Sequence, residues 1–348
     1  MKVLILKPSS LGDVVQAMPV LRLIKKHRPD ADVFWWIDAS LAPLLEGDPD
    51  LAGLIRFDRR GWVSPLNWGE VWRTLREIRC HAFDWVIDLQ SLARTGVAAW
   101  LANGDFTVGL DDHREGARCF YDVVVPRPSW ETHAVDWYLQ VLPVLGVPVD
   151  WEFTWLPARR MAATLVREKW PIEGRRLVLL QPGARWANKR WPLEFFVKLS
   201  CTLSEEFPDT DFAVLGSRHD RELGETISRA LPERCLDLTG RTSLAEMVEW
   251  IRAGSLLVTN DTGPMHVAAA LNKPLVALFG PTEPRRTGPY QQLGQVIQRS
   301  LPCVPCLKDS CANPRPLECL QSITPDLVVA RARQLLSLRT APLAASFE

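Results

Sequence analysis

Short runs of apolar residues alternate with segments of helical periodicity along the first half of the chain. Bounded apolar runs of this length are typical of buried strands, and they occur at residues 2–6, 33–37 and 84–88. Residues 14–26 instead place Val14, Met18 and Leu21 on one face, which predicts a helix. Because strands that alternate with helices require crossover connections, we expect a parallel α/β domain.

The second half of the chain repeats this pattern. Apolar runs predict strands at residues 176–180, 211–216, 256–259 and 274–280, and helical periodicity predicts helices at residues 193–206, 220–230, 244–253 and 326–338. The predicted fold class is therefore α/β, with two doubly wound domains that face each other across a cleft. Ligands of such sheets bind beyond the carboxyl ends of the strands, so the loops there are the expected location of the chemistry.

Proline and charged residues mark a linker between the halves, at residues 147–157 and 171–176. We expect an N-terminal domain over residues 1–160, a C-terminal domain over residues 175–325, and a final helix with a frayed tail over residues 326–348. The sequence contains no short-period repeat or low-complexity tract that would alter this division.

The loop after the first predicted strand carries a candidate catalytic acid. It reads Lys7-Pro-Ser-Ser-Leu-Gly-Asp13, so Ser9, Ser10 and Gly12 form a tight turn with free donors ahead of Asp13. On position alone, an acid at the start of the next helix is best interpreted as a cap. The location at the carboxyl end of the first strand favours a catalytic base instead. The loop lacks a GxGxxG motif, so no nicotinamide cofactor is indicated.

Residues 260–266, Asn-Asp-Thr-Gly-Pro-Met-His, form the most informative segment. A buried strand runs into Asp261, and Gly263 permits close approach of the backbone at the start of a helix. Free N–H groups at this helix end form an anion site, and His266 in the first turn can add a donor. An ordinary capped loop with a core histidine is the alternative. We favour the anion site because Asp261, Thr262, Gly263 and His266 converge on one helix end.

Two further loops of the second half carry charges suited to a nucleotide. Residues 183–192 gather Arg185, Lys189 and Arg190, whose cations can neutralise a diphosphate, although solvated surface charge is an equally good interpretation. Glu222 follows the next predicted strand, where an acid can accept hydrogen bonds from both hydroxyls of a ribose. A helix acid in the first turn is the competing interpretation for Glu222.

Composition limits the remaining possibilities. The 348 residues include 41 basic and 41 acidic side chains, which argues against a nucleic-acid binder that depends on global charge, and 47% hydrophobic residues exclude disorder. The sequence shows neither a signal-peptide core nor a run of about 20 apolar residues, so a cytoplasmic protein is expected. In that reducing compartment disulfides are not expected, and Cys80, Cys119, Cys201 and Cys235 are interpreted as small core residues.

Four other cysteines cluster near the C-terminus, at Cys303, Cys306, Cys311 and Cys319. Their spacing is C-x₂-C-x₄-C-x₇-C, in a segment without a helix or strand pattern. This arrangement suggests a tetrahedral zinc or iron site that stabilises the loop. A set of free thiols packed beneath the loop is the alternative. The metal would be structural and remote from Asp13.

A stretch rich in arginine and tryptophan extends from Arg56 to Arg79, in a chain with an unusually large number of tryptophans, 15. Two interpretations compete. The first is a solvated helix face with core tryptophans. The second is a surface for an anionic, lipid-linked acceptor, with tryptophan at the level of the membrane interface. Arg94 and Arg114 lie further along the same half of the chain.

Together these segments resemble glycosyltransferase family 9, the ADP-heptose lipopolysaccharide heptosyltransferases, over nearly the whole chain. The resemblance is carried by Lys7-Pro-Ser-Ser-Leu-Gly-Asp13, Asp88-Leu-Gln-Ser-Leu92, Lys189-Arg-Trp-Pro192, Asp261-Thr-Gly-Pro-Met-His266 and Phe279-Gly-Pro-Thr282. The N-terminal half is most similar to heptosyltransferase I, at residues 114–118 and 133–135. The resemblance implies a GT-B fold of two Rossmann-like domains, the first binding the acceptor and the second binding ADP-heptose.

The resemblance also implies an inverting transfer of heptose from ADP-heptose to Kdo-lipid A, the inner core of lipopolysaccharide. It implies a protein peripheral to the cytoplasmic face of the inner membrane, without a required cofactor. Asp13 matches the family's general base, Lys189 its phosphate contact and Glu222 its ribose contact. The residues implied for the donor are Ser9, Ser10, Gly12, Lys189, Glu222, Asp261, Thr262, Gly263 and His266, and those for the acceptor are Arg59, Arg60, Arg94 and Arg114.

Two departures from the family pattern bear on the phosphate contacts and on which transfer step the protein catalyses. Ala184 and Arg185 stand where heptosyltransferase I often has hydroxyl residues, and the cysteine segment is more similar to other branches of the family. The alternatives are transfer of another sugar to another glycan, a nucleotide-sugar epimerase of GT-B architecture, and a binding module without catalysis. A divalent ion could assist the diphosphate, but the sequence shows no dedicated carboxylate cage for it.

Overall fold

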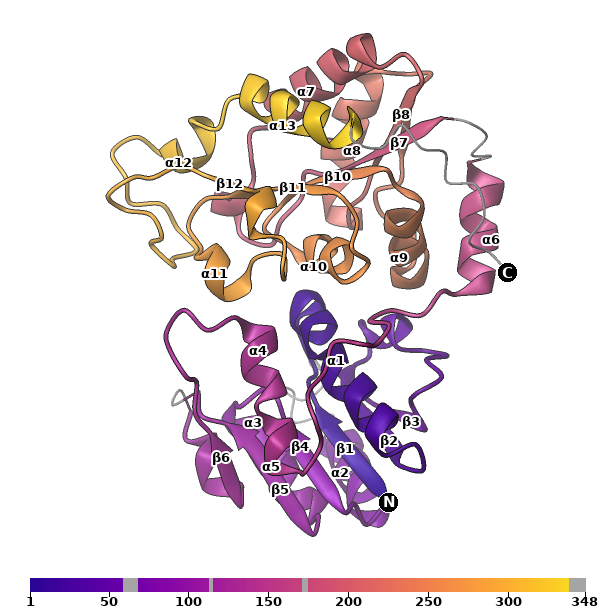
Figure 1. Cartoon of the computed structure of the whole chain (residues 1–348), viewed down its shortest axis with the longest axis vertical. Helices are drawn as coiled ribbons and strands as arrows, with labels where there is room; N and C mark the ends of the chain where they lie inside the picture. The colour runs from indigo at the N-terminus through magenta and orange to yellow at the C-terminus, as the bar shows by residue number, and fades with distance from the viewer. Residues whose placement is uncertain (59–67, 113–114, 171–174, 338–348) are drawn as a thin grey trace. The chain divides into compact units, whose positions relative to one another are not determined.

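The structure, a computed structural model, describes residues 1–58, 68–112, 115–170 and 175–337. The chain divides into two compact units, Met1–Pro157 and Ala158–Glu348. Each unit is built around a parallel sheet with helices on both faces (Figure 1). The predicted α/β class, with two doubly wound domains, is therefore confirmed.

The sheet of the first unit has, within the described residues, six parallel strands in the order β3-β2-β1-β4-β5-β6. They are β1 (Lys2–Leu6), β2 (Asp32–Asp38), β3 (Gly53–Phe57), β4 (Trp85–Asp88), β5 (Phe106–Leu110) and β6 (Val123–Val125). The central strands β1, β2 and β4 are covered on both faces, so they appear in the sequence as continuous apolar runs. The direction of strand order reverses between β1 and β4, the point where sheets of this kind bind ligands.

Helices cover both faces of this sheet, as right-handed crossovers require. One face carries α1 (Leu11–His27), α4 (Ala134–Leu139) and α5 (Val141–Val144), and the other carries α2 (Trp68–Cys80) and α3 (Ala93–Ala102). The described residues of this unit also include the short 3₁₀ turns η1 (Ala42–Leu44) and η4 (Ala117–Phe120). The helix predicted at residues 14–26 is the C-terminal part of α1.

The second unit repeats the arrangement. Its described strands follow the order β12-β11-β10-β7-β8-β9, all parallel. They are β7 (Arg176–Gln181), β8 (Thr210–Val214), β9 (Cys235–Asp237), β10 (Leu256–Asn260), β11 (Leu275–Phe279) and β12 (Val296–Gln298). The order reverses between β7 and β10, which places the ligand edge of this sheet at their carboxyl ends.

An apolar core lies between this sheet and the helices α7, α8 and α13, with Trp191, Phe196 and Phe212 among its largest buried side chains. The helices of the unit are α6 (Arg160–Lys169), α7 (Leu193–Glu206), α8 (Arg221–Ala230), α9 (Leu244–Ala253), α10 (Gly263–Ala270), α11 (Pro284–Thr287), α12 (Glu318–Gln321) and α13 (Pro325–Ser337), with 3₁₀ turns η5 (Ala187–Lys189), η6 (Arg218–Asp220) and η7 (Leu293–Gln295). In the described ranges of both units, none of the helices has the length and apolarity needed to cross a membrane.

Two of the single cysteines are not core residues. Cys235 is buried and Cys201 is half-buried, but Cys80 and Cys119 are exposed. Cys80 is the last residue of α2, and Cys119 lies in the short turn η4. The prediction of small core residues is wrong for these two, because a lone cysteine carries no signal that distinguishes a helix end or a turn from the interior.

Candidate functional site

Asp13, the predicted base, lies in the first turn of α1, just beyond the carboxyl end of β1. Ser10 donates to Oδ2 of Asp13 from its backbone N–H at 2.9 Å and from its hydroxyl at 2.6 Å. The Tyr138 hydroxyl lies 3.4 Å from Oδ1, and the Asp13 side chain keeps 39% of its surface exposed. The carboxylate therefore fixes the start of the helix and is still open to a ligand, so the capping and catalytic interpretations are compatible.

Lys7, which the sequence pattern marks only as the end of a strand, is a buried cation beside Asp13. Its Nζ donates to the Leu89 carbonyl at 2.8 Å and lies 4.0 Å from Oδ1 of Asp13. The same Nζ lies 4.7 Å from the centre of the Tyr138 ring. Burial lowers the pKa of Lys7, but the interactions with Tyr138 and Asp13 outweigh this effect, so the pKa lies above its ordinary value. The site therefore holds an ammonium group next to the carboxylate at neutral pH.

Asp88, at the end of β4, organises the loop whose carbonyl receives Lys7. Its Oδ1 accepts the backbone N–H groups of Gln90 at 2.8 Å and Ser91 at 3.0 Å. Its Oδ2 accepts the Tyr121 hydroxyl at 2.7 Å. The side chain is fully buried, and this burial raises the pKa of Asp88 although the hydrogen bonds oppose the shift. The motif at residues 88–92 thus supports the first site by fixing the loop whose Leu89 carbonyl accepts a hydrogen bond from Lys7.

In the second unit, three polar side chains meet beyond the carboxyl ends of three adjacent strands. Lys189 follows β7, Asp261 follows β10 and Thr282 follows β11. The Nζ of Lys189 lies 2.6 Å from Oδ2 of Asp261, and the Thr282 hydroxyl donates to the same oxygen at 2.6 Å. Asp261 is 7% exposed and the Lys189 side chain 18% exposed. A partly open cation of this kind can exchange its carboxylate partner for an anionic ligand.

A buried amide fixes the loop that carries Lys189. Asn260, at the end of β10, donates from Nδ2 to the Pro182 carbonyl at 2.7 Å. Its Oδ1 accepts the backbone N–H of Trp191 at 3.0 Å. The Trp191 indole N–H in turn donates to the Ile323 carbonyl at 2.8 Å. Both ends of the loop are therefore held against β10, which sets the position of the lysine between them.

The three cations predicted in this loop do not act together. Lys189 pairs with Asp261, and it also lies 4.7 Å from the centre of the Trp186 ring. Arg190 instead donates from Nε to the Ala184 carbonyl at 2.9 Å, so it stabilises the loop, and Arg185 is exposed. Lys189 is the cation of the three that belongs to the cluster with Asp261.

The start of α10 adjoins this cluster. Gly263 is the first residue of the helix and Thr262 is its N-cap. The Thr262 side chain accepts no capping hydrogen bond from the N–H groups of the first turn. Both residues are half-buried, so this helix end is partly accessible. His266 is 9% exposed and has interactions of its own.

Glu222 is exposed in the first turn of α8, beyond the carboxyl end of β8. Its neighbour Asp220 is buried and accepts the backbone N–H of Ser217 at 2.8 Å and the Ser217 hydroxyl at 2.7 Å. A Cβ on Gly183 would lie 2.4 Å from Oδ1 of Asp220, so this close approach of two loops requires glycine. The buried acid is structural, and the exposed Glu222 is the one available to a ligand.

The residues implied for the donor are divided between the units. Ser9, Ser10 and Gly12 lie in the loop of Asp13, and Lys189, Glu222, Asp261, Thr262, Gly263 and His266 lie in the second unit. Of the residues implied for the acceptor, Arg94 is exposed at the second position of α3. Arg59, Arg60 and Arg114 lie outside the described residues.

The clustered cysteines lie in or next to the irregular segment between β12 and α12. Cys303 and Cys311 are exposed, and Cys306 and Cys319 are half-buried. The Asn313 amide lies 3.6 Å from Sγ of Cys303, and the Leu317 backbone N–H donates to Sγ of Cys311 at 3.4 Å. Burial raises the pKa of Cys319, and the three other thiols raise it further. In the part of the chain that the structure describes, no group of three or more potential ligands is arranged to hold a metal ion.

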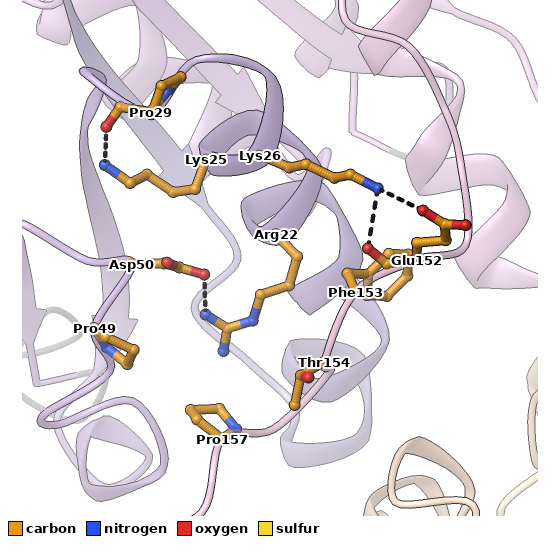
Figure 2. Close-up of a pocket in the computed structure, with 10 residues that line it drawn as sticks. All are labelled: Arg22, Lys25, Lys26, Pro29, Pro49, Asp50, Glu152, Phe153, Thr154 and Pro157. Carbon is orange, nitrogen blue, oxygen red and sulfur yellow. Dashed lines mark hydrogen bonds and ion pairs between the residues drawn. The ribbon is translucent and has the colours of Figure 1, made fainter.

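A cavity of about 540 Å³ lies elsewhere in the first unit, between the C-terminal half of α1 and residues 152–157 (Figure 2). Its cations are engaged: Arg22 pairs with Asp50 at 2.6 Å, and Lys26 pairs with Asp150 at 2.8 Å. Arg22 lies nine residues beyond Asp13, which is about 13 Å along a helix axis. The cavity is therefore separate from the site at Asp13.

Three side chains of the two sites were not predicted as site residues from the sequence. Lys7 and Thr282 share a signal that could have found them, since each is a polar residue close behind a buried strand. Tyr138 has no local signal, because it reaches the Asp13 site from α4, 125 residues along the chain.

Comparison with known proteins matches this arrangement to one family. The family described as Glycosyltransferase family 9 (heptosyltransferase) matches residues 71–316. Lipopolysaccharide heptosyltransferase 1 of Pseudomonas aeruginosa is 31% identical over an alignment that covers 89% of this chain and 87% of that protein.

Solved structures extend the match to the whole fold. A glycosyl transferase family 9 protein of Veillonella parvula has a TM-score of 0.80 at 25% identity, with 97% of each chain covered. The ADP-heptose lipopolysaccharide heptosyltransferase II of Escherichia coli has a TM-score of 0.78 at 24% identity, with 98% of this chain and 100% of that chain covered. The similarity therefore includes both units.

We predict that Asp88→Asn gains stability over the wild type as the pH rises. The amide can keep its acceptor for Gln90 and Ser91 and donate to the Tyr121 oxygen. Because the folded-state pKa of Asp88 is raised, the folded wild type binds its proton more tightly than the unfolded chain does. The wild type therefore loses stability relative to the variant as the pH rises from the pKa of an aspartate in the unfolded chain, about 4, through the raised pKa of Asp88 in the folded protein.

Urea unfolding of both proteins at about pH 4 and about pH 7 measures this difference, in which other titrating groups cancel. A wild type that gains stability over Asp88→Asn between these two values would contradict the role of burial.

Proposed function

The chain belongs to glycosyltransferase family 9, and on that basis we propose that it transfers heptose from ADP-heptose to Kdo-lipid A, with inversion at the anomeric carbon. Its relatives include lipopolysaccharide heptosyltransferases of both numbered types. Membership in the family makes it a glycosyltransferase. The identity of the acceptor and the stereochemical course are part of the proposal.

The observation that carries the proposal is the state of Asp13. An inverting transferase needs a base that is ionised and open to the acceptor hydroxyl. Asp13 is 39% exposed, one of its oxygens is bonded to Ser10, and the Lys7 cation lies 4.0 Å from the other oxygen. Both contacts hold the carboxylate in place, and a neighbouring cation favours the ionised form.

The donor is assigned to the second unit. Lys189 would leave Asp261 to bind the diphosphate, helped by the backbone at the start of α10. The exposed Glu222 would accept the ribose hydroxyls. Asp261, Thr262, Gly263 and His266 are assigned to the phosphate end of the donor. Ser9, Ser10 and Gly12, in the loop of Asp13 in the first unit, are also assigned to donor binding.

The reaction is a single displacement. The acceptor oxygen forms a bond to the anomeric carbon of heptose while the bond from that carbon to the phosphate oxygen breaks. Asp13 takes the proton of the hydroxyl, a role that typically contributes about 10²–10⁴-fold. ADP leaves with the bonding electrons, and Lys189 stabilises the negative charge that develops on it. This single displacement accounts for the proton, the electrons and the charge on ADP without a divalent ion at the diphosphate.

The acceptor is assigned to the first unit, at the cytoplasmic face of the inner membrane. Its acidic sugars would meet Arg59, Arg60, Arg94 and Arg114, of which Arg94 is exposed in the structure. Guanidinium groups suit this task because they bind carboxylates in a bidentate manner. The protein would be peripheral, reaching a lipid-linked substrate from the cytoplasm.

Two other functions are weighed against this proposal. Transfer of a different sugar to a different glycan would use the same base and the same phosphate contacts. A nucleotide-sugar epimerase would have no use for a lipid-linked acceptor, and the similarity to heptosyltransferases makes it the weaker alternative.

We also propose that the cysteine loop holds a structural zinc or iron ion. The three other thiols are near enough to Cys319 to contribute to its raised pKa, and N–H groups approach the sulfurs of Cys303 and Cys311, as they do where thiolates bind a metal. A modest closing of the loop would bring Cys303, Cys306, Cys311 and Cys319 into a tetrahedral set. The ion would stabilise a segment that has little secondary structure of its own.

Asp13→Asn is expected to abolish transfer while ADP binding stays near the wild-type value. The amide preserves the shape and the Ser10 hydrogen bonds but cannot take a proton, so turnover should fall by at least about 100-fold. Turnover is measured as heptose incorporated into Kdo-lipid A. Asp38→Asn is the matched control, since Asp38 also bonds to a serine, Ser40, at the end of the neighbouring strand. Activity of Asp13→Asn within tenfold of wild type would refute the assignment.

Lys189→Ala should weaken ADP binding by about 1.5–3 kcal/mol, the usual value of a hydrogen bond to a charged group. Titration calorimetry with ADP measures the loss. Arg185→Ala is the control, because it removes an equal charge from the same loop without touching Asp261. Unchanged affinity in Lys189→Ala, or an equal loss in both variants, would place the diphosphate elsewhere, provided that thermal melting shows both proteins folded.

Elemental analysis of protein purified without chelator tests the metal site. We expect about one equivalent of zinc or iron, lost in Cys303→Ser and Cys311→Ser and retained in Cys119→Ser. Metal below about a tenth of an equivalent in the wild type, with four titratable thiols in the loop, would exclude the site.

A further inference from the structure

The outward sides of α2 and α3 form one continuous surface. The two helices contact each other and pack on the same face of the first sheet. Leu75 and Ile78 of α2 share an apolar cluster with Ala98 and Ala99 of α3. Because their buried sides point to the same face of the sheet, their exposed sides point the same way. We call this surface the α2–α3 face, and its members are Trp72, Arg73, Arg76, Arg79, Val97 and Trp100.

Helix α2 contributes a tryptophan and three arginines to this surface. Trp72 is 66% exposed, and Arg73, Arg76 and Arg79 are all exposed. Trp72, Arg76 and Arg79 are three or four residues apart and share one stripe of the helix, with Arg73 beside it. Within the described chain, no ion pair engages the three arginines. Glu77 is also exposed, and because it lies four residues after Arg73 it adjoins this stripe.

Helix α3 adds apolar area without any negative charge. Trp100 is 63% exposed and Val97 is 39% exposed, and three residues separate them on one side of the helix. The sequence of α3, ARTGVAAWLA, contains no acidic residue. The exposed indoles of Trp72 and Trp100, on adjacent helices, are not needed for the fold, because neither belongs to the core. Exposed apolar patches of this kind mark interaction sites.

We propose that the α2–α3 face binds an anionic lipid bilayer. Indole rings settle at the headgroup level of a membrane, and arginines are attracted to acidic lipids. A protein partner would also accept tryptophan and arginine, but the two helices are net positive: α2 carries three arginines and two glutamates, and α3 adds Arg94 without an acid. That charge pattern fits a uniformly negative surface. Bound in this way, the first unit would lie against the membrane along its side, with the loop of Asp13 at the edge of the same unit.

This inference rests on the proposed function only in that a lipid-linked acceptor lies in a membrane. The binding test therefore uses vesicles that contain neither donor nor acceptor. Its failure would leave heptosyl transfer untouched, and a failure of transfer would leave vesicle binding untouched.

The experiment is cosedimentation of the full chain with vesicles of phosphatidylglycerol and phosphatidylcholine, or of phosphatidylcholine alone. Wild type is expected to bind the anionic vesicles more tightly, and salt should weaken that binding. Trp72→Ala with Trp100→Ala should lower the partition coefficient at least about tenfold. Arg73→Gln, Arg76→Gln and Arg79→Gln together should lower it about 100-fold, to the level of neutral vesicles.

The matched control is Met161→Ser with Leu165→Ser. These residues are 86% and 44% exposed on α6 of the second unit, where Glu168 is also exposed. The control should bind anionic vesicles within about twofold of wild type, which is a negligible difference in free energy. All variants should melt at the wild-type temperature, since every substituted side chain is exposed.

Three results would overturn the proposal. The wild type would fail to bind anionic vesicles in the first, and either α2–α3 variant would keep wild-type binding in the second. In the third, the α6 control would lose as much vesicle binding as the α2–α3 variants. A self-association measured by sedimentation velocity that disappears in the tryptophan variant, with vesicle binding unchanged, would identify the face as an interface between protein copies. The tryptophan variant should also keep wild-type turnover on a water-soluble Kdo acceptor without acyl chains.

Discussion

Parallel pairing of neighbouring strands is the constraint on which both candidate sites depend. In the second unit β10 pairs with β7 on one side and with β11 on the other, and all three strands point the same way. The residues that follow them therefore leave the sheet at one edge. Lys189 and Thr282 meet Asp261 there, although 72 and 21 residues separate them from it. In the first unit the pairing of β1 with β4 brings Lys7 to the Leu89 carbonyl in the same way.

Buried polar groups then fix the loops that leave these edges. An unpaired polar group in the interior costs free energy, so each such group also dictates the position of its partners. Asp88 and Asn260 are both fully buried, and each binds backbone groups of a neighbouring loop. Lys189 lies on the loop that Asn260 fixes and Asp13 lies at the start of α1, and both of these side chains assigned to chemistry remain partly exposed. Rigid support and an accessible reactive group are what a transferase requires.

Sequence reasoning succeeds where a pattern is local and fails where a contact is not. The apolar runs of β1, β2, β4, β7, β8, β10 and β11 are visible because central parallel strands are covered on both faces. Asp13 and Asp261 are found because each follows such a run. Tyr138 is invisible, since only the fold brings α4 to Asp13, and the bracing role of Arg190 depends on a backbone carbonyl that no sequence pattern identifies. A charge in a loop indicates a site only when its partner is also known.

The measurement that tests heptosyl transfer most directly is acceptor-dependent release of ADP. Purified protein is given ADP-heptose with and without Kdo-lipid A, and both ADP and the glycosylated lipid are quantified. The proposed single displacement predicts ADP release in equal amount to product, only when the acceptor is present, with the anomeric configuration of the new bond inverted. Consumption of ADP-heptose without an acceptor, or product with retained configuration, would contradict the role of Asp13 as a base in a single displacement.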